Sequence, residues 1–290
     1  MSYTDKIFKY AKKLSPQMYR ITVIECGKTS DLCVTPSNKT NDCYSVSKFF
    51  TVTALGMLYD SGILDLNEKI IDIFKDELIE NMDEKWNTVT VHMAMRHEWG
   101  IGGGFLDIDT EDINSYTKRF GTRNDFLKII LSHELPLTPG KEEVYSDAAY
   151  YLLSRVVEKK SGENLYTFLQ KRLFNSLEFE ETAWSCCPNG HSMGATGLFI
   201  RTTDIAKLGQ LYLDKGMYGK QRIISEKWCD IVLENGYELR KCNADGYCKG
   251  GMYGQAIYID PRRRLSVAWE GYDTVGASRK MIEYLERLDS

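Results

Sequence analysis

The chain has 290 residues, of which 43% are hydrophobic and 27% charged, and its net charge is −4. This composition excludes a disordered chain, and the slight negative charge argues against nucleic acid as the main partner. No stretch approaches the ~18 consecutive apolar residues that a membrane-spanning helix needs, so no membrane span is expected.

The first predicted element is an amphipathic helix in residues 1–14. Apolar residues recur there at helical spacing among lysines, at Ile7, Phe8, Ala11 and Leu14. The segment lacks the apolar core of a signal peptide. Provided that the chain begins at its natural start, we therefore expect a cytoplasmic protein.

Strand-like patterns then occur early and late in the chain, and helical periodicity dominates between them. The predicted strands are residues 18–25, 32–35, 42–44, 253–260 and 265–269. The predicted helices are residues 48–59, 67–74, 89–97, 123–132, 147–159, 165–174, 203–214 and 275–288. This order indicates an α+β fold, in which an antiparallel sheet is flanked by N- and C-terminal helices and carries a large, mostly helical insertion.

The same order predicts two domains. We expect a discontinuous sheet domain (residues 1–62 and 217–290), a mostly helical domain (residues 63–216) and an active site at their interface. The one dense basic run, Arg262-Arg263-Arg264, lies between the last two predicted strands. We expect a solvated hairpin turn there rather than a binding patch.

The eight cysteines include no Cys-x-x-Cys pair, and the four histidines are scattered along the chain. Neither a metal site nor a cofactor is therefore expected. In a reducing cytoplasm, most of these cysteines are expected to be free thiols.

The most informative motif is Ser45-Val46-Ser47-Lys48, at the start of the predicted helix 48–59. A serine three positions before a lysine places the hydroxyl and the amine one turn apart on one helix face. A hydroxyl becomes a good nucleophile only when a base takes its proton, and a lysine amine can act as that base. Ser115-x-x-Lys118 fits the same pattern, so the motif alone does not single out Ser45.

A second motif, Tyr145-Ser146-Asp147, opens the predicted helix 147–159 after Pro139-Gly140. Tyr-x-Asp also occurs elsewhere in the chain, and Asp147 could instead be an ordinary helix N-cap. Its functional interpretation therefore depends on the motifs that accompany it.

Taken together and in this order, the motifs give the chain a resemblance to a known family. It resembles the serine β-lactamase and penicillin-binding protein superfamily, closest to the class C β-lactamase and esterase-like branch. The segments that carry the resemblance are Ser45 to Lys48, Gly62 to Leu66, Thr90 to Gly100, Pro139 to Leu153, Gly194 to Leu213 and Lys249-Gly250-Gly251.

The resemblance implies a role for each matching residue. Ser45 would attack an acyl carbon, Lys48 would activate the serine, and Tyr145 would relay the proton. Lys249 would keep the site electropositive or hold a substrate carboxylate. The backbone N–H groups of Ser45 and Met252 would form the oxyanion hole. Substrate-binding positions would be Asp147, Lys249, Gly250 and Gly251.

Two departures from the family pattern affect the expected substrate. Asp147 stands where the family usually has asparagine, and a carboxylate cannot donate a hydrogen bond unless it is protonated. We expect this change to favour esters over peptides or β-lactams, or to weaken the enzyme. Glu98-Trp99 replaces small hydroxyl residues and suggests a reshaped pocket rim.

The sequence thus predicts a serine hydrolase that acts through an acyl-enzyme on a small-molecule ester or amide. The alternative is a catalytically weak or inactive relative that binds a ligand. The sequence gives neither the natural substrate nor the oligomeric state.

Overall fold

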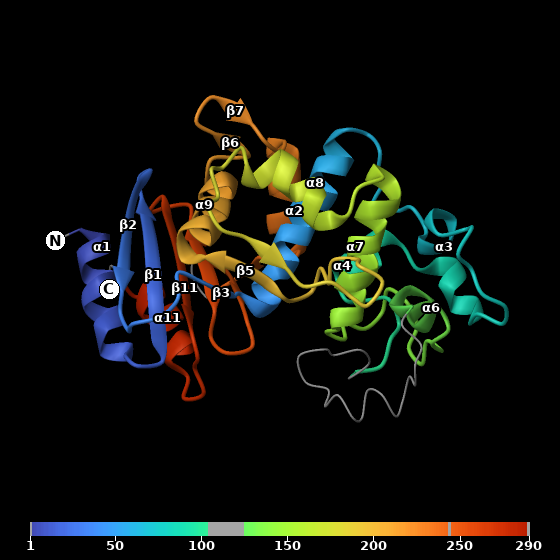
Figure 1. Ribbon diagram of the computed structural model, residues 1–290, viewed down its shortest axis with the longest axis horizontal. Coiled ribbons are helices and arrows are strands. Elements are labelled where there is room, and N and C mark those ends of the chain that lie inside the picture. Colours follow the sequence, from blue (N-terminus) through green and yellow to red (C-terminus); the bar gives the residue numbers. More distant parts are fainter. Residues whose placement is uncertain (1, 104–124, 243–244, 289–290) are drawn as a thin grey trace. The chain divides into compact units, whose positions relative to one another are not determined.

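The computed structural model describes residues 2–103, 125–242 and 245–288 (Figure 1). The rival motif at Ser115 lies outside the described residues. The chain divides into two compact units. We call residues 1–49, 171–183 and 198–290 the sheet unit, and residues 50–170 and 184–197 the helical unit. The chain passes between the units after residues 49, 170, 183 and 197, whereas the expected boundaries were residues 62 and 216.

The sheet unit is built on a six-stranded antiparallel sheet with the order β2-β1-β11-β10-β9-β8. Its strands are β1 (Met18–Glu25), β2 (Lys28–Cys33), β8 (Arg240–Lys241), β9 (Tyr247–Gly250), β10 (Ala256–Asp260) and β11 (Leu265–Gly271). The predicted α+β class with an antiparallel sheet is confirmed. The predicted strand 18–25 agrees with β1, whereas β2 begins before the predicted residues 32–35.

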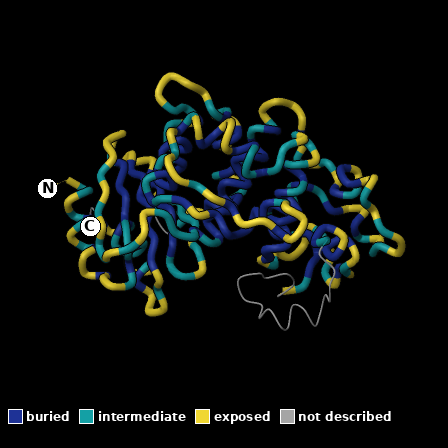
Figure 2. The backbone as a smooth tube through the Cα atoms, viewed as in Figure 1, coloured by how far each residue is buried: buried dark blue, intermediate teal, exposed yellow. Residues whose placement is uncertain are grey.

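Helices cover both faces of this sheet. One face packs against α1 (Tyr3–Ala11) and α11 (Ala277–Glu286) (Figure 1). The Tyr10 ring of α1 stacks on the Tyr284 ring of α11, with centroids 4.0 Å apart. The other face packs against α9 (Thr202–Leu213), a helix that the sequence assigned to the helical domain. Because both faces are covered, β10 and β11 are buried along their whole lengths (Figure 2).

Shorter elements complete the sheet unit. They are η1 (Lys12–Leu14), β3 (Thr40–Asp42), η2 (Tyr44–Val46), β5 (Leu198–Arg201), β6 (Met217–Tyr218), β7 (Gln221–Arg222) and α10 (Glu226–Asn235). The sequence missed β5 and α10. Strands β3 and β5 pair antiparallel, and this pairing brings the chain just before residue 45 beside β5.

The basic run between β10 and β11 is not uniformly solvated, which corrects the expectation for Arg263. The Arg263 side chain is buried. Its guanidinium donates hydrogen bonds to Asp260 Oδ2 at 2.8 Å and to the Leu285 carbonyl at 2.9 Å. It therefore ties the β10–β11 turn to the end of α11. Arg263 is buried because the C-terminal helix α11 packs over this turn, a contact that the local sequence does not show.

The helical unit receives most of α2 (Ser47–Asp60), which begins in the sheet unit. Its other elements are α3 (Ile70–Ile73), η3 (Glu84–Thr88), α4 (Val91–Met95), α6 (Phe126–Leu131), α7 (Asp147–Ser161) and α8 (Leu165–Leu169). A π-helical turn (Gln170–Phe174) and β4 (Ala183–Trp184) lie where the chain passes between units. Several predicted helices are shorter than expected, whereas α7 closely matches its prediction and is mostly buried.

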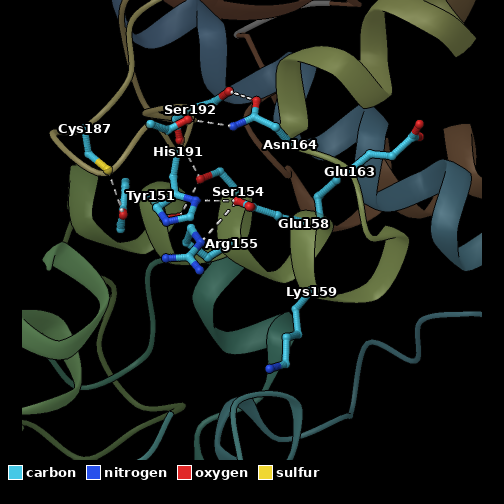
Figure 3. Close-up of polar contacts among 12 residues, drawn as sticks. Tyr151, Ser154, Arg155, Glu158, Lys159, Glu163, Asn164, Cys187, His191 and Ser192 are labelled. Carbon is cyan, nitrogen blue, oxygen red and sulfur yellow. Dashed lines mark hydrogen bonds and ion pairs between the residues drawn. The ribbon is translucent and has the colours of Figure 1, made fainter. Parts of the chain in front are cut away.

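A return segment, residues 184–197, is held against α7 by polar contacts (Figure 3). Ser154 Oγ donates to the Ser192 carbonyl at 2.8 Å, and His191 Nδ1 lies 2.8 Å from Glu158 Oε2. Gly194 has φ 67°, and a Cβ there would lie 2.4 Å from the Tyr150 carbonyl oxygen. Only glycine fits such a position, so the close approach depends on this residue.

In the part of the chain that the structure describes, no helix is both long and apolar enough to cross a membrane.

Candidate active site

Ser45 lies in η2, immediately before α2. Two hydrogen bonds hold the preceding chain: Cys43 N–H donates to the Leu198 carbonyl at 3.0 Å, and Tyr44 N–H donates to Asp42 Oδ1 at 2.8 Å. Tyr44 has a left-handed backbone with φ 47°, which is uncommon for a bulky residue. Ser45 itself is 9% exposed. A bent backbone thus presents a nearly buried hydroxyl at the start of a helix.

Lys48 lies one turn further along and directs its amine at this hydroxyl. Its Nζ donates to Ser45 Oγ at 2.9 Å, and the residue is completely buried. Its neighbours Phe49 and Phe50 are also fully buried. The two side chains that the sequence spacing assigned to one face are therefore in direct contact, in surroundings with little water.

The third motif supplies four predicted site residues at the end of β9: Lys249, Gly250, Gly251 and Met252. This strand end approaches the chain just before Ser45. A Cβ at Gly251 would lie 2.8 Å from the Cys43 carbonyl oxygen, a distance that real side chains do not tolerate. The Tyr44 and Tyr253 rings also meet edge to face, with centroids 5.2 Å apart. The sheet unit thus brings Ser45, Lys48 and the third motif together.

Lys249 has a buried acidic partner that the sequence analysis did not single out. Its Nζ forms an ion pair with the Glu238 carboxylate, and the two side chains are 11% and 2% exposed. Glu238 lies between the end of α10 and β8, in a left-handed backbone conformation with φ 58°. No motif marks it, because its importance comes only from the side chain that it faces.

Tyr145 and Asp147 belong to the helical unit. Tyr145 is 45% exposed, and its ring packs on the His97 imidazole with centroids 4.6 Å apart. The Ser146 N–H donates to His97 Nδ1 at 3.2 Å, and His97 is 1% exposed. His97 therefore supports both the ring and the backbone of the second motif, a role that its position at a helix end did not indicate.

Asp147 is the first residue of α7 and is 1% exposed. The N-cap of this helix is Ser146, whose Oγ accepts from the Ala148 N–H at 3.2 Å. The simpler interpretation of Asp147 as the helix cap is therefore wrong. Capping therefore does not explain why the Asp147 side chain is buried, and its substrate-binding role stays a prediction.

Trp99 is not part of a pocket rim. It is fully buried and packs against Trp86, with ring centroids 5.5 Å apart. Glu98 pairs with Arg96, whose Nε lies 2.8 Å from Glu98 Oε1. These residues thus contribute to the interior and the surface of the helical unit.

Residues 2–103, 125–242 and 245–288 contain no cluster of three or more His, Cys, Asp or Glu side chains that could hold a metal ion.

The sequence profile of a known family covers this site. The family model described as Beta-lactamase matches residues 42–269, which include Ser45, Lys48, Tyr145 and Lys249. The chain belongs to the β-lactamase family. Its sequence profile is therefore that of the β-lactamase-like superfamily.

Individual members of the β-lactamase family are only distantly similar to this chain. An N-acetylmuramyl-L-alanine amidase of Bacillus subtilis (strain 168) is 24% identical, over 78% of this chain and 66% of its own length. A 6-aminohexanoate-dimer hydrolase of Paenarthrobacter ureafaciens is 22% identical, over 75% and 62%. The chain thus spans slightly less than two thirds of these curated relatives.

The fold is also that of solved β-lactamase-family structures. A penicillin-binding protein from Bacillus halodurans superposes with a TM-score of 0.71 at 16% identity, over 97% of this chain and 99% of that one. Similarity at this identity shows the fold alone. The substrate must therefore be argued from the residues of this chain.

Proposed function

We propose that the protein hydrolyses small esters or amides, with esters favoured, through an acyl-enzyme on Ser45. The observation that carries the proposal is the hydrogen bond of 2.9 Å from the buried Lys48 amine to Ser45 Oγ. A hydroxyl in contact with a basic group is the arrangement that nucleophilic catalysis needs.

In the proposed reaction, Ser45 Oγ attacks the acyl carbon and gives its proton to Lys48. By resemblance to the family, Tyr145 would relay this proton to the leaving group. The backbone N–H groups of Ser45 and Met252 stabilise the oxyanion. Loss of one such donor typically raises the activation free energy by ~3 kcal/mol. The leaving alcohol or amine departs with the proton that Tyr145 returns to it. Water then attacks the ester on Ser45, releases the acid and restores the free hydroxyl.

The relatives support acyl transfer without fixing the acyl group. One is named an amidase and another a hydrolase of 6-aminohexanoate dimer, and both names describe those proteins. We favour esters for this chain because Asp147 replaces the asparagine usual in the family. A substrate amide there would meet a carboxylate that accepts but does not donate hydrogen bonds.

Labelling with a fluorophosphonate probe tests the nucleophile. We expect Ser45→Ala to abolish labelling and turnover of short-chain nitrophenyl esters. Lys48→Ala should lower kcat/KM by roughly 10²-fold or more, because general base assistance is lost. Ser61→Ala, which changes an exposed serine at the end of α2, is the control and should label like the wild type. No labelling together with no Ser45-dependent turnover would favour the ligand-binding alternative.

The Asp147→Asn variant tests the substrate preference. We expect it to gain activity on a chromogenic cephalosporin relative to nitrophenyl esters, because the amide can donate to a substrate carbonyl. Glu142→Gln, which removes an exposed carboxylate just before the motif, is the control. An unchanged substrate ratio would remove Asp147 from the proposal.

A further inference from the structure

The cation of the third motif is already neutralised inside the sheet unit. Lys249 Nζ and the Glu238 carboxylate form an ion pair whose side chains are 11% and 2% exposed. Solvent screens charges weakly at such a depth. A second carboxylate brought to Lys249 would therefore be repelled by Glu238 at short range.

The backbone around Glu238 is built to hold this carboxylate in place. Tyr237 and Leu239 on either side are fully buried, and the Tyr237 ring packs near that of Trp228, with centroids 6.4 Å apart. These contacts anchor the segment between α10 and β8. The position of the Glu238 side chain is thus fixed by its neighbours as well as by the ion pair.

The register of β8 and β9 explains why Glu238 needs its unusual backbone. Arg240 pairs with Cys248, so one further step of the register would set Leu239 opposite Lys249. In a regular strand, the next side chain, Glu238, would then point to the opposite face. The left-handed conformation of Glu238, φ 58°, breaks this alternation and lets its carboxylate reach Lys249.

We propose that Glu238 sets the charge selectivity of the Ser45 site, by pairing with Lys249 so that acyl substrates bearing a carboxylate are disfavoured and uncharged ones are accepted. This inference rests on the proposed acyl transfer at Ser45. Glu238 acts through Lys249 and is therefore a positioning residue. The substrate class that follows is an uncharged small ester or amide.

Two esters of equal chain length measure this selectivity. They are 4-nitrophenyl hexanoate and the mono-4-nitrophenyl ester of adipic acid, which ends in a carboxylate instead of a methyl group. The wild type should prefer the hexanoate in kcat/KM by roughly tenfold or more, as expected when like charges are brought together. Equal or greater wild-type activity on the adipate ester would overturn the inference, and this comparison needs no variant.

The Glu238→Gln variant then tests the residue. It removes the negative charge of Glu238 from beside Lys249, so the ratio of adipate to hexanoate kcat/KM should rise by roughly tenfold. The double variant Glu238→Gln with Lys249→Met should lose that gain, because the attracting charge is gone. Glu283→Gln, which removes an exposed carboxylate on α11, is the matched control and should keep the wild-type ratio.

The substrate ratio distinguishes selectivity from a merely structural role, because a damaged fold lowers both activities together. An unchanged ratio in a folded Glu238→Gln protein would overturn the inference while the proposed function stands. No Ser45-dependent turnover of either ester in the wild type would overturn the proposed function, and this inference with it.

Discussion

Glu270 on β11 is a buried carboxyl group with incomplete hydrogen bonding. Asn41 Nδ2 donates to its Oε2 at 3.0 Å, but the buried Oε1 has no hydrogen-bond partner among the residues that the structure describes. Burial raises the pKa of Glu270 well above its usual range, although Asn41 and Arg20 oppose the shift, and Asp42 and Asp204 add to it. The folded state therefore favours the protonated, uncharged form.

This raised pKa makes the free energy of unfolding depend on pH. The contribution of Glu270 to stability is fully present below the carboxyl pKa of the unfolded chain, near 4.5, and is lost as pH rises toward the higher folded-state pKa. Glu270→Gln mimics the protonated form and should raise Tm at pH 7 by about 2 °C or more. At pH 4 the two proteins should melt together.

Thermal unfolding at pH 4, 5, 6 and 7 measures this effect. Glu283→Gln, an exposed carboxylate on α11, is the control and should show no such trend. A Glu270→Gln protein that is less stable than the wild type at pH 7 would mean that Glu270 is charged in the fold.

At the scale of elements, α9 packs tightly on the sheet at Gly209. The Ser266 hydroxyl donates to the Ala206 carbonyl at 2.8 Å across this contact. A Cβ at Gly209 would lie 2.3 Å from Ser266 Oγ and 2.8 Å from Ile259 Cγ2. The absence of a side chain therefore sets how closely the helix and the sheet approach.

Gly209→Ala should destabilise the protein. Alanine favours a helix over glycine by about 1 kcal/mol, but overpacking a core costs roughly 1–3 kcal/mol. The overpacking should prevail, because the strands beneath are central in the sheet and cannot move aside. Urea unfolding should show a lower midpoint than the wild type. Gly103→Ala is the control and should be neutral, because among the described residues its Cβ would meet Val144 at an ordinary contact distance of 3.8 Å. A midpoint at or above that of the wild type would show that α9 can move.

At the scale of the whole molecule, the fold is stabilised by packing rather than by cross-links. All eight cysteines are free in the structure. A chain of this length buries roughly 75% of its unfolded surface, so a stable core does not need disulfides.

Reducing agent should therefore leave Tm unchanged. Alkylation of the unfolded, unreduced protein should modify all eight thiols, as counted by mass spectrometry, and a reduced sample is the control. A mass that corresponds to fewer modified thiols before reduction than after it would reveal a disulfide.

The sequence by itself determined the features that depend on residues close together in the chain. The Ser45–Lys48 contact follows from the turn of a helix, and the boundaries of β1 and α7 follow from hydrophobic periodicity and capping. The family order of the motifs, and with it the fold class, was also evident from the sequence.

Only the tertiary structure decided which distant side chains meet. Glu238 reaches Lys249 through a left-handed residue beside a hairpin, His97 lies under Tyr145, and α11 buries Arg263. The tertiary structure also decided the position of α9. The sequence predicted it as part of the helical domain, but it packs on the sheet. Periodicity shows which face of an element is apolar, but its partner depends on how the whole chain packs, and no local pattern encodes that choice.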